Sequence, residues 1–199
     1  MDFYFLRHGA LEGPAPGTFY GVTDFPLSQE GRQQAIHAGE RLRGVEFAAA
    51  YVSPLLRARQ TFALLQKSAG FSSLTPTLDA RLQEMNFGAM ETLNYTQIQQ
   101  KQPELAEAIK NNWGDVRFPD GESVDEFRSR VDEFVWDIAA RFADGQKVLV
   151  VCHGGVIRTS LCQLLQLPNP AFAHLHSEFA RWATVRVSEG WGVLRELNA

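Results

Sequence analysis

The sequence predicts an α/β fold: a three-layer sandwich with a mostly parallel central sheet, helices on both faces and a small helical cap insertion. Two observations predict it. Short apolar runs alternate with longer segments whose apolar residues recur at helical spacing, and this alternation is typical of parallel sheets covered by helices. At 199 residues and 45% hydrophobic content, the chain is long enough for a single domain, residues 1–199, with a substantial core.

The N-terminal part predicts two strands, each followed by a helix. Asp2 to Leu6 is the first strand, and the Gly- and Pro-rich residues from Gly9 to Pro26 form a loop whose length indicates function. Ser28 is expected to cap the first helix. Phe47 to Val52 is the second strand, and the Ser-Pro pair at 53–54 is the N-cap and first-turn signature of the second helix. Apolar residues at helical spacing mark both helices: Ala35, Ala38, Leu42 and Val45, then Leu55, Ala58, Phe62 and Leu65.

The middle of the chain predicts a weak strand, a cap and a long helix. Leu74 to Leu78 is the strand candidate. The segment from Gln83 to Gly121 is more polar and lacks a sustained period, so we interpret residues 83–121 as a cap of short helices. Ser123 and Glu126 form a capping box that marks the next helix start. The apolar stripe behind it predicts a long, well-packed helix: Val124, Phe127, Val131, Phe134, Val135, Ile138 and Phe142.

The C-terminal part predicts one more strand–helix unit and a hairpin. Lys147 to Cys152 is the most hydrophobic strand, and a helix is expected at Gly155 to Leu165. Trp182 to Val187 and Trp191 to Leu197 are expected to form a hairpin that turns at residues 189–190.

Composition excludes several classes of function. A net charge of −4 and a pI near 5.7 argue against a broad nucleic-acid interface, which needs a basic face. No stretch reaches the ~18 apolar residues that span a bilayer, and the first apolar run breaks at Arg7, too early for a signal peptide. Cys152 and Cys162 lie in apolar segments, so we expect buried, reduced thiols. We therefore expect a cytoplasmic protein that binds neither nucleic acid nor membrane, and we leave its oligomeric state open, a homodimer included.

Two of the apolar runs end in a histidine that is followed by glycine. In parallel sheets, ligands bind outside the carboxyl ends of the strands, where helix N-termini point their free N–H groups. We expect His8, the turn after Ser53 and His153 at that edge. Arg57 lies one turn into the second predicted helix, and we prefer it to Arg59 because it is nearer the helix start.

These residues predict a pocket for a tetrahedral dianion, most simply phosphate. Arg7 and Arg57 supply guanidinium groups that fork onto phosphate oxygens. Phosphoryl transfer depends largely on positioning and preorganised positive charge. A neutral imidazole can also attack phosphorus directly and form a phosphohistidine. Glu84, just after the third predicted strand, is the candidate acid for the leaving oxygen and the later base for water.

Four motifs in this order resemble the histidine phosphatase superfamily, which has the phosphoglycerate mutase-like fold. They are LRHG at 6–9, SPLLRARQT at 53–61, LQEMNFG at 82–88 and VCHGG at 151–155. The resemblance runs over nearly the whole chain. It implies that His8 is the nucleophile, that Glu84 is the acid and base, and that the phosphate is held by Arg7, Arg57 and His153. It also implies neither a metal ion nor an organic cofactor.

The loop after His8 departs from the family pattern. Family members often carry a polar Glu or Thr after RHG and an Asn a few positions on, whereas residues 10–13 of this chain are Ala, Leu, Glu and Gly. Thr23 or a backbone N–H is the expected substitute for those contacts. The N–H of Gly154, at the start of a helix, is expected to add a further phosphate donor.

Further stretches are most similar to alpha-ribazole-5'-phosphate phosphatases, enzymes of cobalamin nucleotide-loop assembly. They are YGVTDFPLSQEGRQQA at 20–35, EMNFG at 84–88, GES at 121–123 and WATVRVSEGWGVLRELN at 182–198. The resemblance implies a phosphomonoesterase whose partner is a small phosphorylated substrate. Three alternatives stay open: a broad-specificity sugar-phosphate phosphatase, a phosphoglycerate mutase-like enzyme, and a phospholigand-binding protein without catalysis.

Several other residues receive a weaker interpretation. His174 and His176 are too few for a metal site and are expected in an exposed loop. Trp113 can stack on an aromatic base, but we expect Arg117 and Phe118 to face the substrate more closely.

Overall fold

The central sheet has six strands, and most of them are parallel. The computed structural model describes the backbone of residues 1–199 and every side chain except that of Asn169. The strand order is β3-β2-β4-β1-β5-β6. The strands are β1 (Asp2–Arg7), β2 (Ala49–Val52), β3 (Pro76–Leu78), β4 (Lys147–Cys152), β5 (Trp182–Ser188) and β6 (Trp191–Glu196). The first four are mutually parallel, β5 runs antiparallel to β1, and β6 runs antiparallel to β5, which confirms the predicted fold class.

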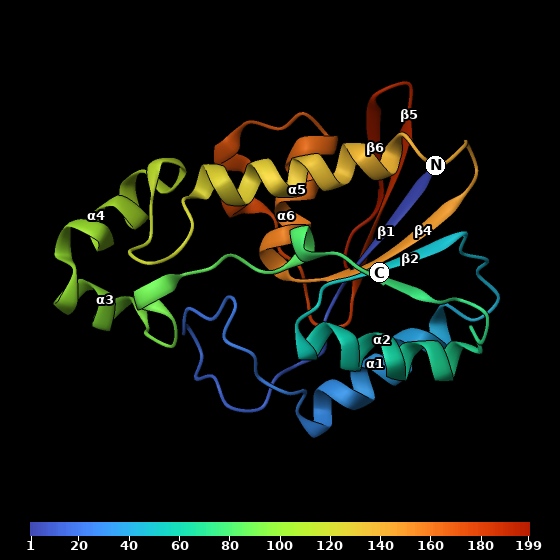
Figure 1. Cartoon of the computed structure of the whole chain (residues 1–199), viewed down its shortest axis with the longest axis horizontal. Coiled ribbons are helices and arrows are strands. Elements are labelled where there is room, and N and C mark those ends of the chain that lie inside the picture. Colours follow the sequence, from blue (N-terminus) through green and yellow to red (C-terminus); the bar gives the residue numbers. More distant parts are fainter.

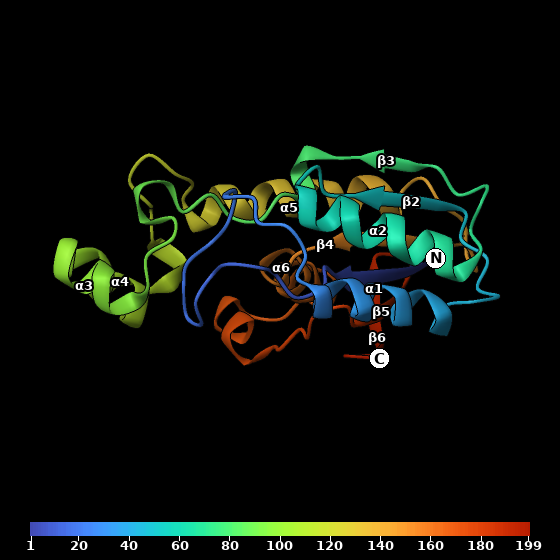
Figure 2. The same cartoon turned by 90° about the horizontal axis from the view of Figure 1, so that it is seen from below.

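Helices cover both faces of this sheet (Figure 1). On one face lie α1 (Gln29–Arg41) and α2 (Leu56–Ala69), packed against each other. The other face carries α5 (Val124–Ala139) and α6 (Gly154–Leu164). Figure 2 shows α3 (Tyr95–Lys101) and α4 (Pro103–Asn111) beyond the end of the sheet, away from the layered body.

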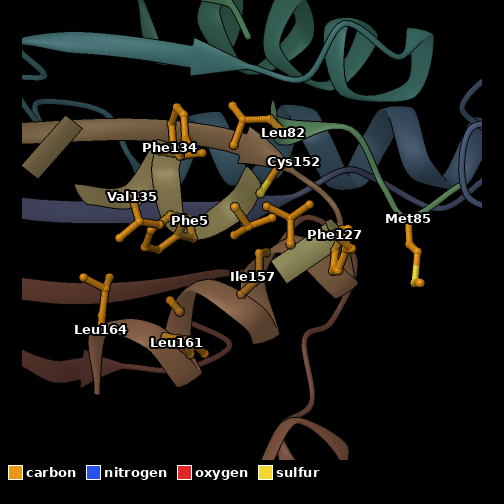
Figure 3. Close-up of a cluster of buried hydrophobic side chains, with 14 of the residues drawn as sticks. Phe5, Leu82, Met85, Phe127, Phe134, Val135, Cys152, Ile157, Leu161 and Leu164 are labelled. Atoms are coloured by element: carbon orange, nitrogen blue, oxygen red, sulfur yellow. The ribbon is translucent and has the colours of Figure 1, made fainter. Parts of the chain in front are cut away.

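Alternate side chains of the central strands supply two cores. Phe3 and Phe5 of β1 are fully buried on the side of α5 and α6, whereas Leu6 is buried on the side of α1 and α2. Figure 3 shows Phe5 beside Val135 of α5. Because β1 and β4 are buried on both faces, they are continuous apolar runs in the sequence. Their carboxyl ends are therefore held rigidly.

Most helix and turn signals in the sequence are confirmed. The Ser28 hydroxyl accepts from the N–H of Gly31 and caps α1. Ser123 and Glu126 form a full capping box at α5. The hairpin turns at Glu189 and Gly190, whose φ angles of 51° and 80° lie in the left-handed region that such turns need.

The predicted start of α2 is wrong. The helix begins at Leu56, and its N-cap residue Leu55 makes no side-chain capping bond. Ser53 is instead bonded through its hydroxyl to His153, and the N–H of Leu56 donates to Asp24 at 2.6 Å. A side chain from a distant loop therefore supplies the cap, which local sequence signals do not reveal.

Other boundaries also differ from the predictions. The weak strand begins at Pro76 rather than Leu74, and the long helix ends at Ala139, before Phe142. The first helix ends at Arg41, before Val45, and Gly44 follows with a φ angle of 81°. The second strand begins at Ala49 rather than Phe47, which instead packs edge-on against Tyr4 at a ring-centroid distance of 5.2 Å.

The 83–121 segment contains only short helices: η2 (Gly88–Met90), α3, α4 and η3 (Trp113–Asp115). Phe118 anchors it, since this buried ring contacts Phe19, Phe87 and Trp113. Across the described part of the chain, no helix has both the length and the apolar character needed to traverse a bilayer.

Candidate active site

Both strand-end histidines lie at the same edge of the sheet. His8 follows β1 and His153 follows β4, and these two strands are parallel neighbours. Their ring centroids are 5.2 Å apart, and both side chains are almost completely buried. The N-terminus of α6 begins at Gly154, directly after His153. The sequence prediction of one shared edge is therefore matched by the geometry.

His8 presents a free lone pair. Its Nδ1 lies 2.8 Å from the carbonyl oxygen of Gly9, which can only accept, so Nδ1 carries the proton and Nε2 does not. Burial holds the pKa of His8 well below its usual value, and the charges of Arg57 and Arg7 lower it further. The ring is thus neutral near pH 7, with Nε2 available as a nucleophile.

Glycine is required next to His8 by close packing. A Cβ on Gly9 would lie 2.3 Å from the carbonyl oxygen of Gly31 in α1. The Gly9 N–H donates to the Thr61 hydroxyl of α2 at 3.1 Å. The loop that leaves His8 is therefore held tightly against both helices.

His153 has the opposite tautomer. The Nε–H of Arg57 donates to His153 Nδ1 at 3.1 Å, so Nδ1 carries the lone pair and Nε2 carries the proton. That Nε2–H donates to the Ser53 hydroxyl at 2.8 Å. Burial holds the pKa of His153 well below its usual value, with Arg57 and His8 contributing. His153 is a neutral hydrogen-bond donor at the same edge where His8 is an acceptor.

Arg57 is fully buried and Arg59 is exposed, in agreement with the choice made from helix position. Its guanidinium donates to the carbonyl oxygens of Thr23, at 3.0 Å, and Gly21. With the bond to His153, three of its five N–H groups are used. The Thr23 backbone, not its hydroxyl, is what contacts Arg57.

Arg7 has an unused donor. Its Nη1 donates to the Ser177 carbonyl oxygen at 2.6 Å, and its guanidinium lies 3.8 Å from the centroid of the Phe179 ring. Its Nε is buried without a hydrogen-bond partner among the described residues. A buried unpaired N–H costs about 1–3 kcal/mol, which an anion at this position would offset.

Glu84 is fixed beside the helix that follows His153. One carboxylate oxygen accepts from the N–H of Gly155 at 2.9 Å, and the other accepts from the N–H of Met85 at 3.1 Å. A Cβ on Gly155 would lie 2.2 Å from the Glu84 carboxylate. The second glycine of the HGG motif therefore makes room for the carboxylate.

The sequence reasoning missed an arginine that clamps the Glu84 loop. Arg130 of α5 donates to the carbonyl oxygens of Arg81 and Gln83, each at 2.8 Å, and of Glu84, at 3.1 Å. Glu122 pairs with the same guanidinium at 2.6 Å. The ESVDEFRSR stretch offered no local signal for this contact, because its partner lies more than 40 positions away.

A second missed residue holds the loop that receives Arg57. The Glu91 carboxylate accepts from the backbone N–H groups of Gly21, Val22 and Thr23, at 3.0 to 3.2 Å. Arg57 binds two carbonyls of the same loop. The two charged side chains thus fix this loop through opposite backbone groups.

The unusual loop at residues 10–13 is held through its backbone. The Ala10 N–H donates to Gln34 and its carbonyl accepts from the N–H of Ser28. Glu12 is exposed to solvent. Thr23 is held in the site region by the bond from Arg57 to its carbonyl oxygen, and its substitution for the missing polar contacts stays a prediction.

A cavity of about 780 Å³ adjoins the site through Glu84 and Gly155. Trp113 and His174 line it. The expectation that Arg117 and Phe118 face the substrate is wrong. Phe118 is 1% exposed and packs in the core, and Arg117 is exposed and pairs with Glu126. Within the described side chains, no group of three or more His, Cys, Asp or Glu has the arrangement of metal ligands.

The fold, together with the histidines and arginines at this edge of the sheet, is typical of one superfamily. The family model of the histidine phosphatase superfamily (branch 1) matches residues 3–199, so the chain belongs to that superfamily. An adenosylcobalamin/alpha-ribazole phosphatase of Salmonella typhi is 30% identical over 200 residues, which cover 100% of this chain and 96% of the relative.

Solved structures agree with this assignment. The alpha-ribazole phosphatase from Shigella flexneri has a TM-score of 0.89 and 26% identity, and the match covers 100% of this chain and 96% of that chain. A mycobacterial glucosyl-3-phosphoglycerate phosphatase has a TM-score of 0.86 and 27% identity, with 100% and 98% covered. The chain is a histidine phosphatase, as its motifs implied.

Proposed function

We propose that this histidine phosphatase hydrolyses phosphomonoesters through a phosphohistidine at His8, without a metal ion, and that alpha-ribazole 5'-phosphate is its substrate. The observation that carries the mechanism is the pair of opposite tautomers. His8 offers a lone pair at Nε2 for attack on phosphorus, and His153 offers an N–H at Nε2 for binding the phosphoryl oxygens.

The first chemical step forms the phosphoenzyme. The Nε2 lone pair of His8 attacks phosphorus, and the bond from phosphorus to the leaving oxygen breaks. Glu84, as the carboxylic acid, gives its proton to that oxygen, so a neutral alcohol departs. The His8 Nδ1–H bond to Gly9 stabilises the positive charge that develops on the ring.

The second step reverses these roles. Water attacks phosphorus, the bond from phosphorus to Nε2 breaks, and the Glu84 carboxylate takes a proton from the water. Glu84 is again an acid and His8 is again neutral, so the cycle closes without a cofactor. Splitting the displacement into two steps lowers each barrier.

Donors around His8 hold the phosphoryl oxygens in both steps. Arg7 contributes its unpaired Nε–H, Arg57 its remaining N–H groups, and His153 its Nε2–H, which exchanges Ser53 for phosphate. The N–H of Gly154, the first residue of α6, completes the set.

The substrate assignment is supported by the similarity, over the full length of this chain, to an adenosylcobalamin/alpha-ribazole phosphatase and to an alpha-ribazole phosphatase. An enzyme with this substrate would act in cobalamin nucleotide-loop assembly, in the cytoplasm. Residues 83–121 would form the cap over the substrate. A sugar-phosphate phosphatase is the second candidate, favoured by the similarity to a glucosyl-3-phosphoglycerate phosphatase.

The test is phosphate release from a panel of monoesters, with and without EDTA. Alpha-ribazole 5'-phosphate should have the highest kcat/KM, ahead of adenosylcobalamin 5'-phosphate, sugar phosphates and 3-phosphoglycerate, and EDTA should leave the rates unchanged. A flat profile would assign a generalist phosphatase instead. Conversion of 3-phosphoglycerate to 2-phosphoglycerate without phosphate release would assign a mutase, and no turnover of any ester would assign a binding protein.

A further inference from the structure

The cavity beside Glu84 lies on the leaving-group side of the reaction. An acid that protonates the leaving oxygen must face the leaving alcohol, and Glu84 and Gly155 belong to both the active site and the cavity wall. A volume of about 780 Å³ is within the range of small-ligand pockets. Given the proposed function, this cavity is where the alcohol portion of the substrate lies.

Two aromatic rings from distant parts of the chain meet at this cavity. Trp113 belongs to η3 and Phe172 to η4 (Asn169–His174), and both line the cavity. Their ring planes differ by only 14°, with centroids 6.2 Å apart. The pair gives this part of the cavity an aromatic wall, which suits a flat ring.

Arg158 connects this aromatic wall to the catalytic edge. Its guanidinium carbon lies 4.1 Å from the centroid of the Phe172 ring, and its Nε donates to the carbonyl oxygen of Gly154 at 3.2 Å. No hydrogen bond from its terminal nitrogens to a described residue is present. Burial lowers the pKa of Arg158, but a guanidinium stays charged, so these N–H groups are available as donors.

Three kinds of group therefore follow one another along the cavity wall: the carboxylate of Glu84, the guanidinium of Arg158 and the aromatic rings. Glu84 contacts the helix start at Gly155, Arg158 bonds to the neighbouring Gly154, and Phe172 lies over Arg158. A leaving group that matches this order carries the ester oxygen at one end, hydroxyl oxygens in the middle and a flat ring at the far end.

We propose that the Trp113–Phe172 pair stacks on a flat heterocycle of the leaving group and that Arg158 binds a hydroxyl oxygen of the sugar that joins this heterocycle to the phosphate. The site takes the 5'-phosphate of a ribosylated flat heterocycle. The proposal rests on the proposed phosphatase function and assigns specificity residues to it. A simple sugar phosphate fills only the half of the site nearest Glu84.

The test separates ring recognition from sugar recognition with two esters. Alpha-ribazole 5'-phosphate carries ring and sugar, and ribose 5-phosphate carries the sugar alone. Trp113→Leu and Phe172→Leu keep apolar bulk but remove the flat ring. We expect each to lower kcat/KM for the ring-bearing ester by about 10–100-fold more than for ribose 5-phosphate, the scale of one stacking contact. Trp113→Phe should restore most of the discrimination.

Arg158→Met should show the other pattern. Because its proposed partner is a sugar oxygen, kcat/KM should fall for both esters by a similar factor, about 10-fold or more. The control is Trp191→Ala, an equally large change at a β6 side chain that is 66% exposed and lies outside the cavity lining. It should leave both esters unaffected.

The results distinguish the ring contact, the sugar contact and the phosphatase function from one another. Equal losses on both esters in the Trp113 and Phe172 variants would mean a structural role for the rings, and would overturn the subsite while the phosphatase assignment stands. Loss confined to the ring-bearing ester in Arg158→Met would overturn the sugar contact. If the unaltered protein released phosphate from neither ester, the proposed function itself would fail.

Discussion

The catalytic edge and the adjoining cavity are held together in different ways. At the edge, His8, His153, Arg57 and Glu84 are each fixed by hydrogen bonds to backbone or to one another, and three of the four are buried. In the cavity, Trp113 and Phe172 meet through ring contacts, on 3₁₀ helices outside the sheet. Rigid strand ends therefore carry the chemistry, and irregular segments, which tolerate change, carry the selectivity.

The largest effect should come from the edge. His8→Asn removes the nucleophilic lone pair but keeps a polar side chain of similar reach, so phosphatase activity should fall roughly 10⁴-fold or more. The Trp113, Phe172 and Arg158 variants should each lose far less activity than this. Steady-state kinetics measure the effect, and an unchanged thermal melting curve excludes unfolding. Activity within tenfold of the unaltered protein would contradict the assignment of His8.

Glu84→Gln should have the next largest effect, and it should depend on the leaving group. The amide cannot give a proton, so kcat for an alkyl ester should fall about 10²–10⁴-fold. p-Nitrophenyl phosphate has a leaving group that departs without protonation, so its phosphorylation step should be much less affected. Equal losses in the rate of the phosphorylation step, measured as the pre-steady-state burst with each ester, would show that Glu84 does not act as the acid.

Gly155→Ala tests the contact where the two regions meet. The new Cβ would lie 2.2 Å from the Glu84 carboxylate, which must move. A displacement near 1 Å costs on the order of 10²-fold in rate. The loss should again be greater for alkyl esters than for p-nitrophenyl phosphate. Gly154→Ala, whose Cβ would meet Arg7 at an ordinary 3.4 Å, should lose less.

The smallest expected effect is that of pH around neutrality. Because burial and two arginines hold the pKa of His8 below its usual value, the fall in kcat/KM from His8 protonation should begin well below pH 6.5. Between pH 6.5 and 7.5, His8 should change the rate by less than about twofold. An acid limb centred at pH 6.5 or above would contradict this environment.

The same two histidines should make stability depend on pH in one direction. Their folded pKa values are lower than in the unfolded chain, so below about pH 6.5 the unfolded state binds more protons. The free energy of unfolding should therefore fall as pH falls from there. Denaturant unfolding at pH 7.5 and 5.5 measures this, and His8→Asn should have the shallower dependence.

The comparison also explains which features the sequence predicts. His8 and His153 follow apolar runs that are buried on both faces, so strand order and the carboxyl-edge rule place them without a structure. Arg57 follows from its distance to a helix start. The tautomers of His8 and His153 cannot be predicted from the sequence. That of His8 depends on its bond to the Gly9 carbonyl, and that of His153 depends on a bond to Arg57, 96 positions away.

The cavity was harder to predict because its segments have little period. In such a segment an aromatic side chain can face the core or the ligand, and the sequence does not separate the two. Phe118 proved to be core and Trp113 a cavity wall. Arg130 and Glu91 were missed for a related reason, since each binds backbone groups of a distant loop, which any sequence could supply.

The central claim is that His8 and His153 have unequal roles, and trapping the intermediate tests it most directly. The protein is mixed with excess substrate carrying labelled phosphate, quenched in alkali within milliseconds, and digested for peptide mapping. Label is expected on Nε2 of His8, in a peptide that is unlabelled in His8→Asn. Label on His153, or turnover without any labelled histidine, would contradict it.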